Sequence, residues 1–187
     1  GAQLVSGLYD AIESANADAE VFAVVVTNEG DTFCAGANLK ERLGHAAVAA
    51  TARRAIGLDQ LFTTIQTSAT PILGKIAGHA LGGGVGLAAC FDISVAAEDV
   101  KFGFTEVRIG VAPAVISVVC LPKMRPGEAM EAFLRGNRFS GKKAAAYGLV
   151  NRAVPAAALD GAIDEVLADL RKGGPTALGV AKRLVHE

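Results

Sequence analysis

The chain has 187 residues, of which 51% are hydrophobic and 20% are charged. This length suits one globular domain with a sizeable core, and the composition excludes a disordered chain. With 18 basic and 19 acidic residues the net charge is -1, and like charges form no blocks, so we expect neither a nucleic-acid partner nor a membrane surface.

The apolar runs and the cysteines indicate the cellular compartment of the protein. No run approaches the roughly 20 residues that a membrane-spanning helix needs, and the first residues lack the pattern of a signal peptide. Cys34, Cys90 and Cys120 are widely spaced and fit no disulfide or metal-binding pattern. We therefore expect free, buried thiols, no metal site and a cytoplasmic protein.

Helical and strand patterns alternate in the first half of the chain. Apolar residues recur at helical spacing from about Gln3 to Ala17, which predicts an amphipathic helix. The β-branched run over 22–27 is typical of a strand buried on both faces. A helical pattern over 46–67 and a second strand over 71–77 follow, and this strand leads into a cluster of glycines.

The alternation continues after the glycines. A helix of about eight residues is expected first, then strands over 92–97 and 100–104, then helical pieces between 114 and 136 that are broken by prolines. The remaining predictions are a helix capped by Ser140 and ending near Gly148, an extended piece over 149–151, and helical segments around Pro155 and Pro175. This pattern predicts an α/β fold.

Five glycines lie within residues 78–86. Because ordering a glycine costs more backbone entropy than ordering any other residue, such a cluster marks unusual backbone angles or a close approach to the main chain. A P-loop is excluded because no Lys-Ser/Thr pair follows the glycines. Residues 84–89 fit the dinucleotide fingerprint G-x-G-x-x-A, and Glu106 lies further along the chain. The helix of about eight residues that follows the glycines is, however, too short to connect two parallel strands as that motif requires.

Two interpretations of the glycine cluster remain. The glycines could serve close packing of a helix against a strand, or their N–H groups could stabilise developing negative charge as an oxyanion site. A second turn of small residues, Cys34 to Ala37, also follows a buried strand. Two such turns could each supply one N–H group to the same oxygen.

Three stretches, FCAGANLKE (33–41), GHALGGGVGLAACFDISVAAE (78–98) and KFGFTEVRIG (101–110), resemble the signature segments of the enoyl-CoA hydratase/isomerase, or crotonase, family. RFSGKKAAAYGLV (138–150) resembles the usual continuation of that family. The resemblance implies a crotonase-like spiral of ββα units with helices packed on the sheets. It implies one such domain over 1–187, without the family's N-terminal strand and its C-terminal trimerisation helices.

The resemblance also implies a substrate, an assembly and a set of site residues. It implies an acyl-CoA substrate, no separate cofactor because the substrate carries the CoA, and a homotrimer or a dimer of trimers. Carried over to matching positions, it assigns the oxyanion hole to the backbone N–H groups of Ala37 and Gly83. It places the adenine end of CoA on the main chain around Ala35, Leu39 and Lys40.

The pattern of carboxylates departs from that of the family. Two-glutamate hydratases carry one Glu in the glycine-rich helix and a second about twenty residues later. Here the second is Glu106, but the first position is Gly86, and Ala114-Val115-Ile116 replaces a glycine-rich run. Glu106 is therefore the expected acid and base, with a pKa raised by its apolar neighbours Phe102, Phe104, Val107 and Ile109.

Several alternatives stay open from the sequence. Hydration of a 2-enoyl-CoA is the expected activity. The first alternative is a Δ3,Δ2-enoyl-CoA isomerase, which needs only one carboxylate. The second is a catalytically silent acyl-CoA-binding subunit, which needs none. Glu106 could instead be exposed and paired with Arg108. Cys34 has no activating group nearby and is expected to be a packed thiol, whereas His79 either lines a pocket or forms a structural hydrogen bond.

Overall fold

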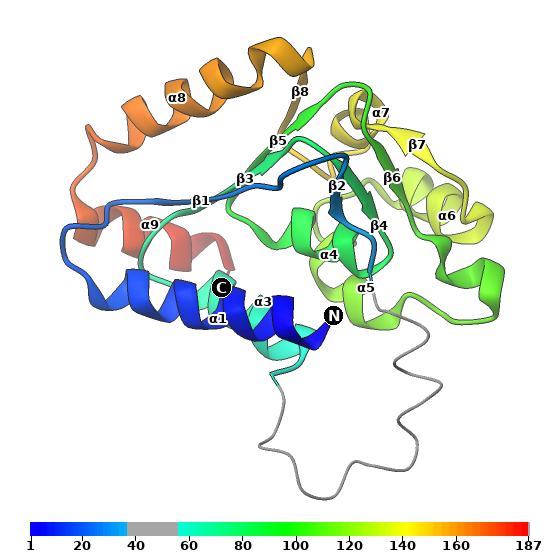
Figure 1. Ribbon diagram of the computed structural model, residues 1–187, viewed down its shortest axis with the longest axis horizontal. Coiled ribbons are helices and arrows are strands. Elements are labelled where there is room, and N and C mark those ends of the chain that lie inside the picture. The colour runs from blue at the N-terminus through cyan, green and yellow to red at the C-terminus, as the bar shows by residue number, and fades with distance from the viewer. Residues whose placement is uncertain (37–55, 187) are drawn as a thin grey trace, which may run out of the picture.

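The computed structural model of the protein describes residues 1–36 and 56–186. Its centre consists of two four-stranded sheets (Figure 1). The first sheet contains β1 (Val24–Val26), β3 (Ile72–Ile76), β5 (Ile93–Ala97) and β8 (Arg152–Val154). These strands lie in the order β1-β3-β5-β8 and all pair in parallel.

The second sheet is made of shorter strands. It contains β2 (Thr32–Cys34), β4 (His79–Leu81), β6 (Lys101–Gly103) and β7 (Phe139–Ser140), in the order β2-β4-β6-β7. Only the pair β6 and β7 is antiparallel among these strands. The chain alternates between the sheets, from β1 to β2, from β3 to β4 and from β5 to β6. A helical segment follows each of these pairs, as expected for ββα units.

Helices surround the two sheets and one of them lies inside. The helices are α1 (Ala2–Ala17), α3 (Leu58–Thr67), α4 (Gly83–Cys90), α5 (Ala114–Cys120), α6 (Pro126–Arg135), α7 (Gly141–Ala146), α8 (Leu159–Leu170) and α9 (Pro175–His186), with 3-10 turns η1 (Thr105–Ile109) and η2 (Ala156–Ala158). No helix in residues 1–36 and 56–186 combines the length and the apolar character that crossing a membrane requires.

The helix α4 is the central element of the core. It contacts α3 and α5 on one side and the strands β2 and β4 on the other (Figure 1). All of its residues from Gly84 to Cys90 are buried. A helix that is apolar all round can be accommodated only in such a position. The glycine-rich turn at its start is therefore held between layers of the core.

Most elements lie where the sequence predicts them. The helix α4 has the expected eight residues, and Ser140 caps α7 by accepting a hydrogen bond from the Lys143 N–H. The extended piece expected over 149–151 is wrong: Leu149 and Val150 fill the core in a bend, and the strand begins at Arg152. Of the helix expected over 46–67, the described part is α3; residues 46–55 lie outside the described residues.

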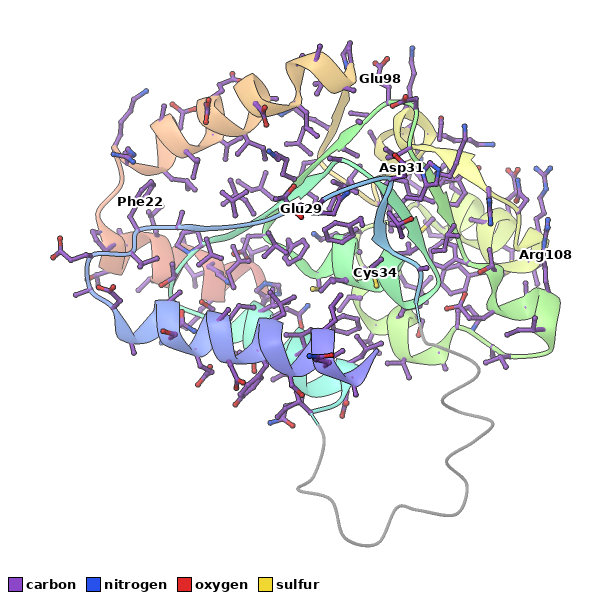
Figure 2. The ribbon with its side chains drawn as sticks, viewed as in Figure 1. Phe22, Glu29, Asp31, Cys34, Glu98 and Arg108 are labelled. Atoms are coloured by element: carbon purple, nitrogen blue, oxygen red, sulfur yellow. The ribbon has the colours of Figure 1, made fainter. Side chains whose placement is uncertain are left out.

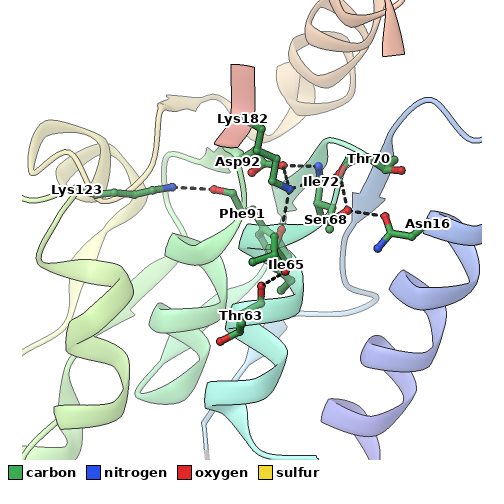
Figure 3. Close-up of polar contacts among 11 residues, drawn as sticks. Asn16, Thr63, Ile65, Ser68, Thr70, Ile72, Phe91, Asp92, Lys123 and Lys182 are labelled. Carbon is green, nitrogen blue, oxygen red and sulfur yellow. Dashed lines mark hydrogen bonds and ion pairs between the residues drawn. The ribbon is translucent and has the colours of Figure 1, made fainter. Parts of the chain in front are cut away.

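A buried ion pair ties the C-terminal helix to the first sheet (Figure 3). Asp92, just before β5, accepts a hydrogen bond of 2.7 Å from the Ile72 N–H and lies 2.8 Å from the Lys182 ammonium. Lys182 also donates to the Ile65 carbonyl at 2.7 Å, and its side chain is only 7% exposed. The pair is well satisfied, so it holds α9 against α3 and β3.

Candidate active site

The two glycine-containing turns meet at the start of α4. Gly36, which follows β2, has a φ of 84°, and Gly82, which follows β4, has a φ of 53°. A first side-chain carbon on Gly36 would lie 3.1 Å from the Gly83 nitrogen and 3.0 Å from the Leu81 carbonyl oxygen. Both positions require glycine because of their backbone angles, and the turns are in direct contact.

Close packing of α4 brings these turns together. A side chain at Gly84 would overlap the Cys34 carbonyl group, so the backbone of α4 touches the end of β2. Figure 2 shows Cys34 beside α4 at the centre of the molecule. The packing interpretation of the glycine cluster is confirmed for Gly84. It does not compete with the oxyanion interpretation, because the same contact places the two turns side by side.

The structure covers part of the predicted site. Gly83 is the first residue of α4, so its N–H is among those that find no acceptor within the helix. Ala35 is exposed next to Gly36. Ala37, Leu39 and Lys40, which the sequence analysis assigns to the oxyanion hole and to CoA binding, lie outside the described residues. Their roles stay predictions.

A cleft of about 420 Å³ opens beside the two turns. Ala35, Gly36, Gly82 and Gly83 line it on the side of the turns, and Glu106 lines it from η1. The remaining wall is mostly apolar and comes from Leu58 of α3 and from Ile109 and residues 111–116 around the start of α5. A largely apolar cleft with a few convergent polar groups is the usual form of a small-molecule site.

Glu106 is half-buried at this cleft. Its Oε1 would lie 3.1 Å from a first side-chain carbon on Gly82, so the carboxylate rests against the glycine turn. Its Oε2 is buried and accepts no hydrogen bond from any described residue. Burial raises the pKa of the carboxyl above its ordinary value of 4.5, and a hydrogen bond from its own backbone opposes the rise. A raised pKa makes a carboxyl group better suited to general acid and base catalysis than an ordinary carboxyl group.

The alternative of an exposed pair between Glu106 and Arg108 is wrong. No ion pair of Glu106 occurs among the residues that the structure describes, and Arg108 is an exposed side chain at the periphery in Figure 2. Phe102 and Phe104 are fully buried, whereas Ile109 is 53% exposed. The apolar setting expected around Glu106 therefore comes from β6 and the residue after it, more than from the far end of η1.

Aromatic packing holds Glu106 in place. The ring of Phe104 lies 4.1 Å from that of Phe133 on α6, and the ring of Phe102 stacks on that of Phe139 of β7. These contacts fix the backbone on the N-terminal side of η1. On the other side, Gly110 ends the turn with a φ of 74°. The carboxylate is thus carried by a short, anchored segment, as precise positioning requires.

Burial of Glu106 predicts a dependence of stability on pH. Because the pKa of Glu106 is raised in the folded state, there is a pH interval in which the folded protein keeps a proton that the unfolded chain has lost. The contribution of Glu106 to the free energy of unfolding therefore falls as pH rises above the ordinary glutamate range. Glu106→Gln should therefore unfold at a higher temperature than the wild type at neutral pH. The difference should vanish below about pH 4, and a thermal unfolding series across pH measures it. Equal unfolding temperatures at neutral pH would show that the carboxylate is not destabilised.

Gly86 and Ile116, the two departures from the hydratase pattern, are in contact. A first side-chain carbon on Gly86 would lie 2.5 Å from Cγ2 and 2.8 Å from Cβ of Ile116, and 3.0 Å from the ring of Phe62. Ile116 is only 3% exposed and Phe62 only 2%. The space in which a side chain at position 86 would lie is therefore filled. A carboxylate at this position would require a different residue on α5.

The filled space predicts that Gly86→Ala destabilises the protein. Overpacking of a tight core costs about 1–3 kcal/mol, and Ile116 and Phe62 are both almost fully buried. Gly127→Ala is the matched control, because Gly127 lies in α6 with nothing within 4 Å of an added carbon. Urea unfolding should show the loss for Gly86→Ala alone. An equally stable Gly86→Ala protein would mean that α5 can move away from α4.

The other candidate residues have structural roles. The Nδ1 of His79 accepts a hydrogen bond of 3.2 Å from the Lys101 N–H, and His79 is not among the residues that line the cleft. The three cysteines are free, as predicted; Cys90 and Cys120 are buried, which raises the pKa of both thiols, whereas Cys34 is only partly buried. None of the three lines the cleft.

Some residues of the cleft wall carry no signal in the sequence. Asp59, in the first turn of α3, and Pro113, before α5, also line the cleft. No motif marks either of them. Residues 114–116 did carry a signal, because they replace a glycine-rich run, but the sequence did not show that Ile116 packs against Gly86.

The chain is similar to known sequences and solved structures. The sequence model described as Enoyl-CoA hydratase/isomerase matches residues 1–187. A Thermus thermophilus protein provisionally named an enoyl-CoA hydratase is 34% identical over 98% of this chain and 73% of its own length. A Syntrophomonas wolfei protein named crotonyl-CoA hydratase is 30% identical over 95% of this chain and 69% of its own length. The solved structure of an enoyl-CoA hydratase from Mycobacterium avium superposes with a TM-score of 0.85 and 35% identity, over 99% of this chain and 70% of that one. The predicted crotonase-like α/β fold is confirmed.

Proposed function

Since the chain belongs to the enoyl-CoA hydratase/isomerase family, we propose that it adds water to the double bond of a 2-enoyl-CoA thioester. The observation that supports this proposal best is the placement of Glu106 against Gly82, next to the Gly83 N–H at the start of α4. A base and a backbone donor thus face one cleft. This is the pair of groups that a reaction through a thioester enolate requires.

Each group has a definite role in the proposed reaction. The thioester carbonyl oxygen accepts a hydrogen bond from the Gly83 N–H, and a second from the Ala37 N–H that the sequence resemblance implies. Glu106 takes a proton from water while the water oxygen bonds to C3. The electrons of the double bond move onto the carbonyl oxygen, giving an enolate. The protonated Glu106 then returns a proton to C2, so atoms and charge balance.

Backbone donors suit this step because they are fixed before charge develops. The orientation of the Gly83 N–H is set by the turn at Gly82, so little reorganisation of this donor accompanies enolate formation. The CoA moiety belongs to the substrate in this scheme. The main chain around Ala35, Leu39 and Lys40 is proposed to hold its adenine end, and a trimer or a dimer of trimers is the proposed assembly.

One observation favours a second candidate, a Δ3,Δ2-enoyl-CoA isomerase. Ile116 and Phe62 fill the space beside Gly86, so the described part of the site offers no second carboxylate there. An isomerase needs only one. Glu106 would remove a proton from C2 of a 3-enoyl-CoA, the oxyanion hole would hold the dienolate, and Glu106 would deliver the proton to C4.

Parallel assays of 2-enoyl-CoA and 3-enoyl-CoA separate these candidates. The hydratase proposal expects a 3-hydroxyacyl-CoA from the 2-enoyl substrate, detected by mass as the addition of one water. Conversion of the 3-enoyl substrate alone, without any hydroxyacyl product, would replace it by the isomerase. A protein that binds acyl-CoA but converts neither substrate would be the silent binding subunit.

A further inference from the structure

Ile116 is the one bulky side chain among the buried residues of the cleft wall. The other buried wall residues are Gly82 and Pro113, whereas Ala114 and Val115 on the same helix are exposed. Ile116 lies on α5 and presses on α4 at Gly86, which has no side chain to oppose it. We propose that Ile116 is a specificity-determining residue that excludes acyl groups branched at C3. This inference rests on the proposed function in assuming that the cleft binds an acyl-CoA thioester.

The position of Ile116 along α4 relates it to C3. Gly86 lies three residues after Gly83, which corresponds to about 4.5 Å along the helix axis. Carbon–carbon bonds are about 1.5 Å long, so an acyl chain whose carbonyl oxygen binds at Gly83 and which extends along α4 brings C3 and its substituents to the level of Gly86. The methyl group Cγ2 of Ile116 covers Gly86, which is buried and does not line the cleft, so at this level of α4 the side chain in the cleft wall is that of Ile116.

Ile116 cannot withdraw to make room for a branch. The ring of Phe62, which borders the same space beside Gly86, is 2% exposed and lies 3.0 Å from the point where a Gly86 side chain would begin. Val119 and Cys120, which follow on α5, are also buried. Interiors packed in this way resist small displacements, so a methyl branch at C3 would meet a rigid wall. A linear acyl group avoids that contact.

Binding of two saturated thioesters tests the inference without any turnover. Butyryl-CoA and 3-methylbutyryl-CoA differ by one methyl group at C3 and contain no double bond to react. One methylene in a hydrophobic pocket is worth roughly 10- to 200-fold in discrimination, so isothermal titration calorimetry should show that the wild type binds butyryl-CoA about tenfold or more tightly. Ile116→Ala should reduce the ratio to below about threefold, and Ile116→Val should give an intermediate ratio.

The controls keep this inference separate from the proposed function. Val118→Ala removes an exposed side chain of the same helix that does not line the cleft, and should leave the ratio unchanged. Ile116→Val removes one methyl group only, so it carries the test if Ile116→Ala fails to fold. A wild type that binds both thioesters equally well, or a ratio unchanged in both Ile116 variants, would overturn the inference alone. Absence of binding of either thioester would overturn the acyl-CoA assignment itself.

Discussion

Glu106→Gln should lower kcat by roughly 10³-fold while KM changes little. Glutamine keeps the size and shape of the side chain but can neither take a proton from water nor return one to C2. The described part of the site offers no second carboxylate beside Gly86, because Ile116 fills that space. Apart from Asp59 on α3, no other described carboxylate lines the cleft and could share the task, so the loss should be large. Steady-state kinetics on a 2-enoyl-CoA measure it.

Glu128→Gln is the matched control for this variant. Glu128 lies on the surface of α6 and pairs with Arg125, far along the chain from the turns at the cleft. Its replacement should leave kcat and KM unchanged. If Glu106→Gln keeps more than about a tenth of the wild-type kcat, Glu106 is not the general base of the reaction.

Gly83→Pro should lower kcat by roughly 10²- to 10³-fold, because proline removes the Gly83 N–H, which we propose as a donor of the oxyanion hole. The first position of a helix tolerates proline, whose fixed φ suits that position. Gly82 before it has a ψ of -124° and is outside the helical region that a following proline disfavours. The fold should therefore survive the change, and thermal unfolding checks that it does.

Gly83→Ala separates loss of the donor from crowding of the site. It keeps the N–H, and its added carbon would lie 3.2 Å from the flexible end of Leu58. It should retain at least about a tenth of the wild-type kcat. If Gly83→Ala loses as much activity as Gly83→Pro, crowding and not the missing hydrogen bond explains the effect.

The site could be located from the sequence because its parts are continuous along the chain. The glycine cluster at 78–86 shows both the special backbone angles and the start of a short helix, and Glu106 lies in one recognisable motif. The apolar residues Phe102 and Phe104, four and two positions before it, indicate its burial. Local patterns of this kind predict local structure well.

The parts that the sequence did not reveal depend on contacts between distant segments. The strands β2, β4 and β7 have two or three residues each, too few for any periodicity to mark them. The contact between Gly86 and Ile116 joins positions thirty residues apart and follows only from the packing of α5 on α4. The sequence shows that Gly86 and Ile116 each depart from the hydratase pattern. It does not show that Ile116 fills the space left by the missing side chain at Gly86.

Exchange of the C2 protons of butyryl-CoA in D₂O measures whether Glu106 and the Gly83 N–H together form and hold a thioester enolate. The saturated thioester cannot be hydrated or isomerised, so deuterium at C2 reports enolate formation alone. Mass spectrometry should show rapid incorporation with the wild type and with Glu128→Gln. Incorporation should be about 10³-fold slower with Glu106→Gln and about 10²-fold slower with Gly83→Pro. Equal rates for the wild type and Glu106→Gln, or no incorporation by a wild type that binds butyryl-CoA, would contradict the account.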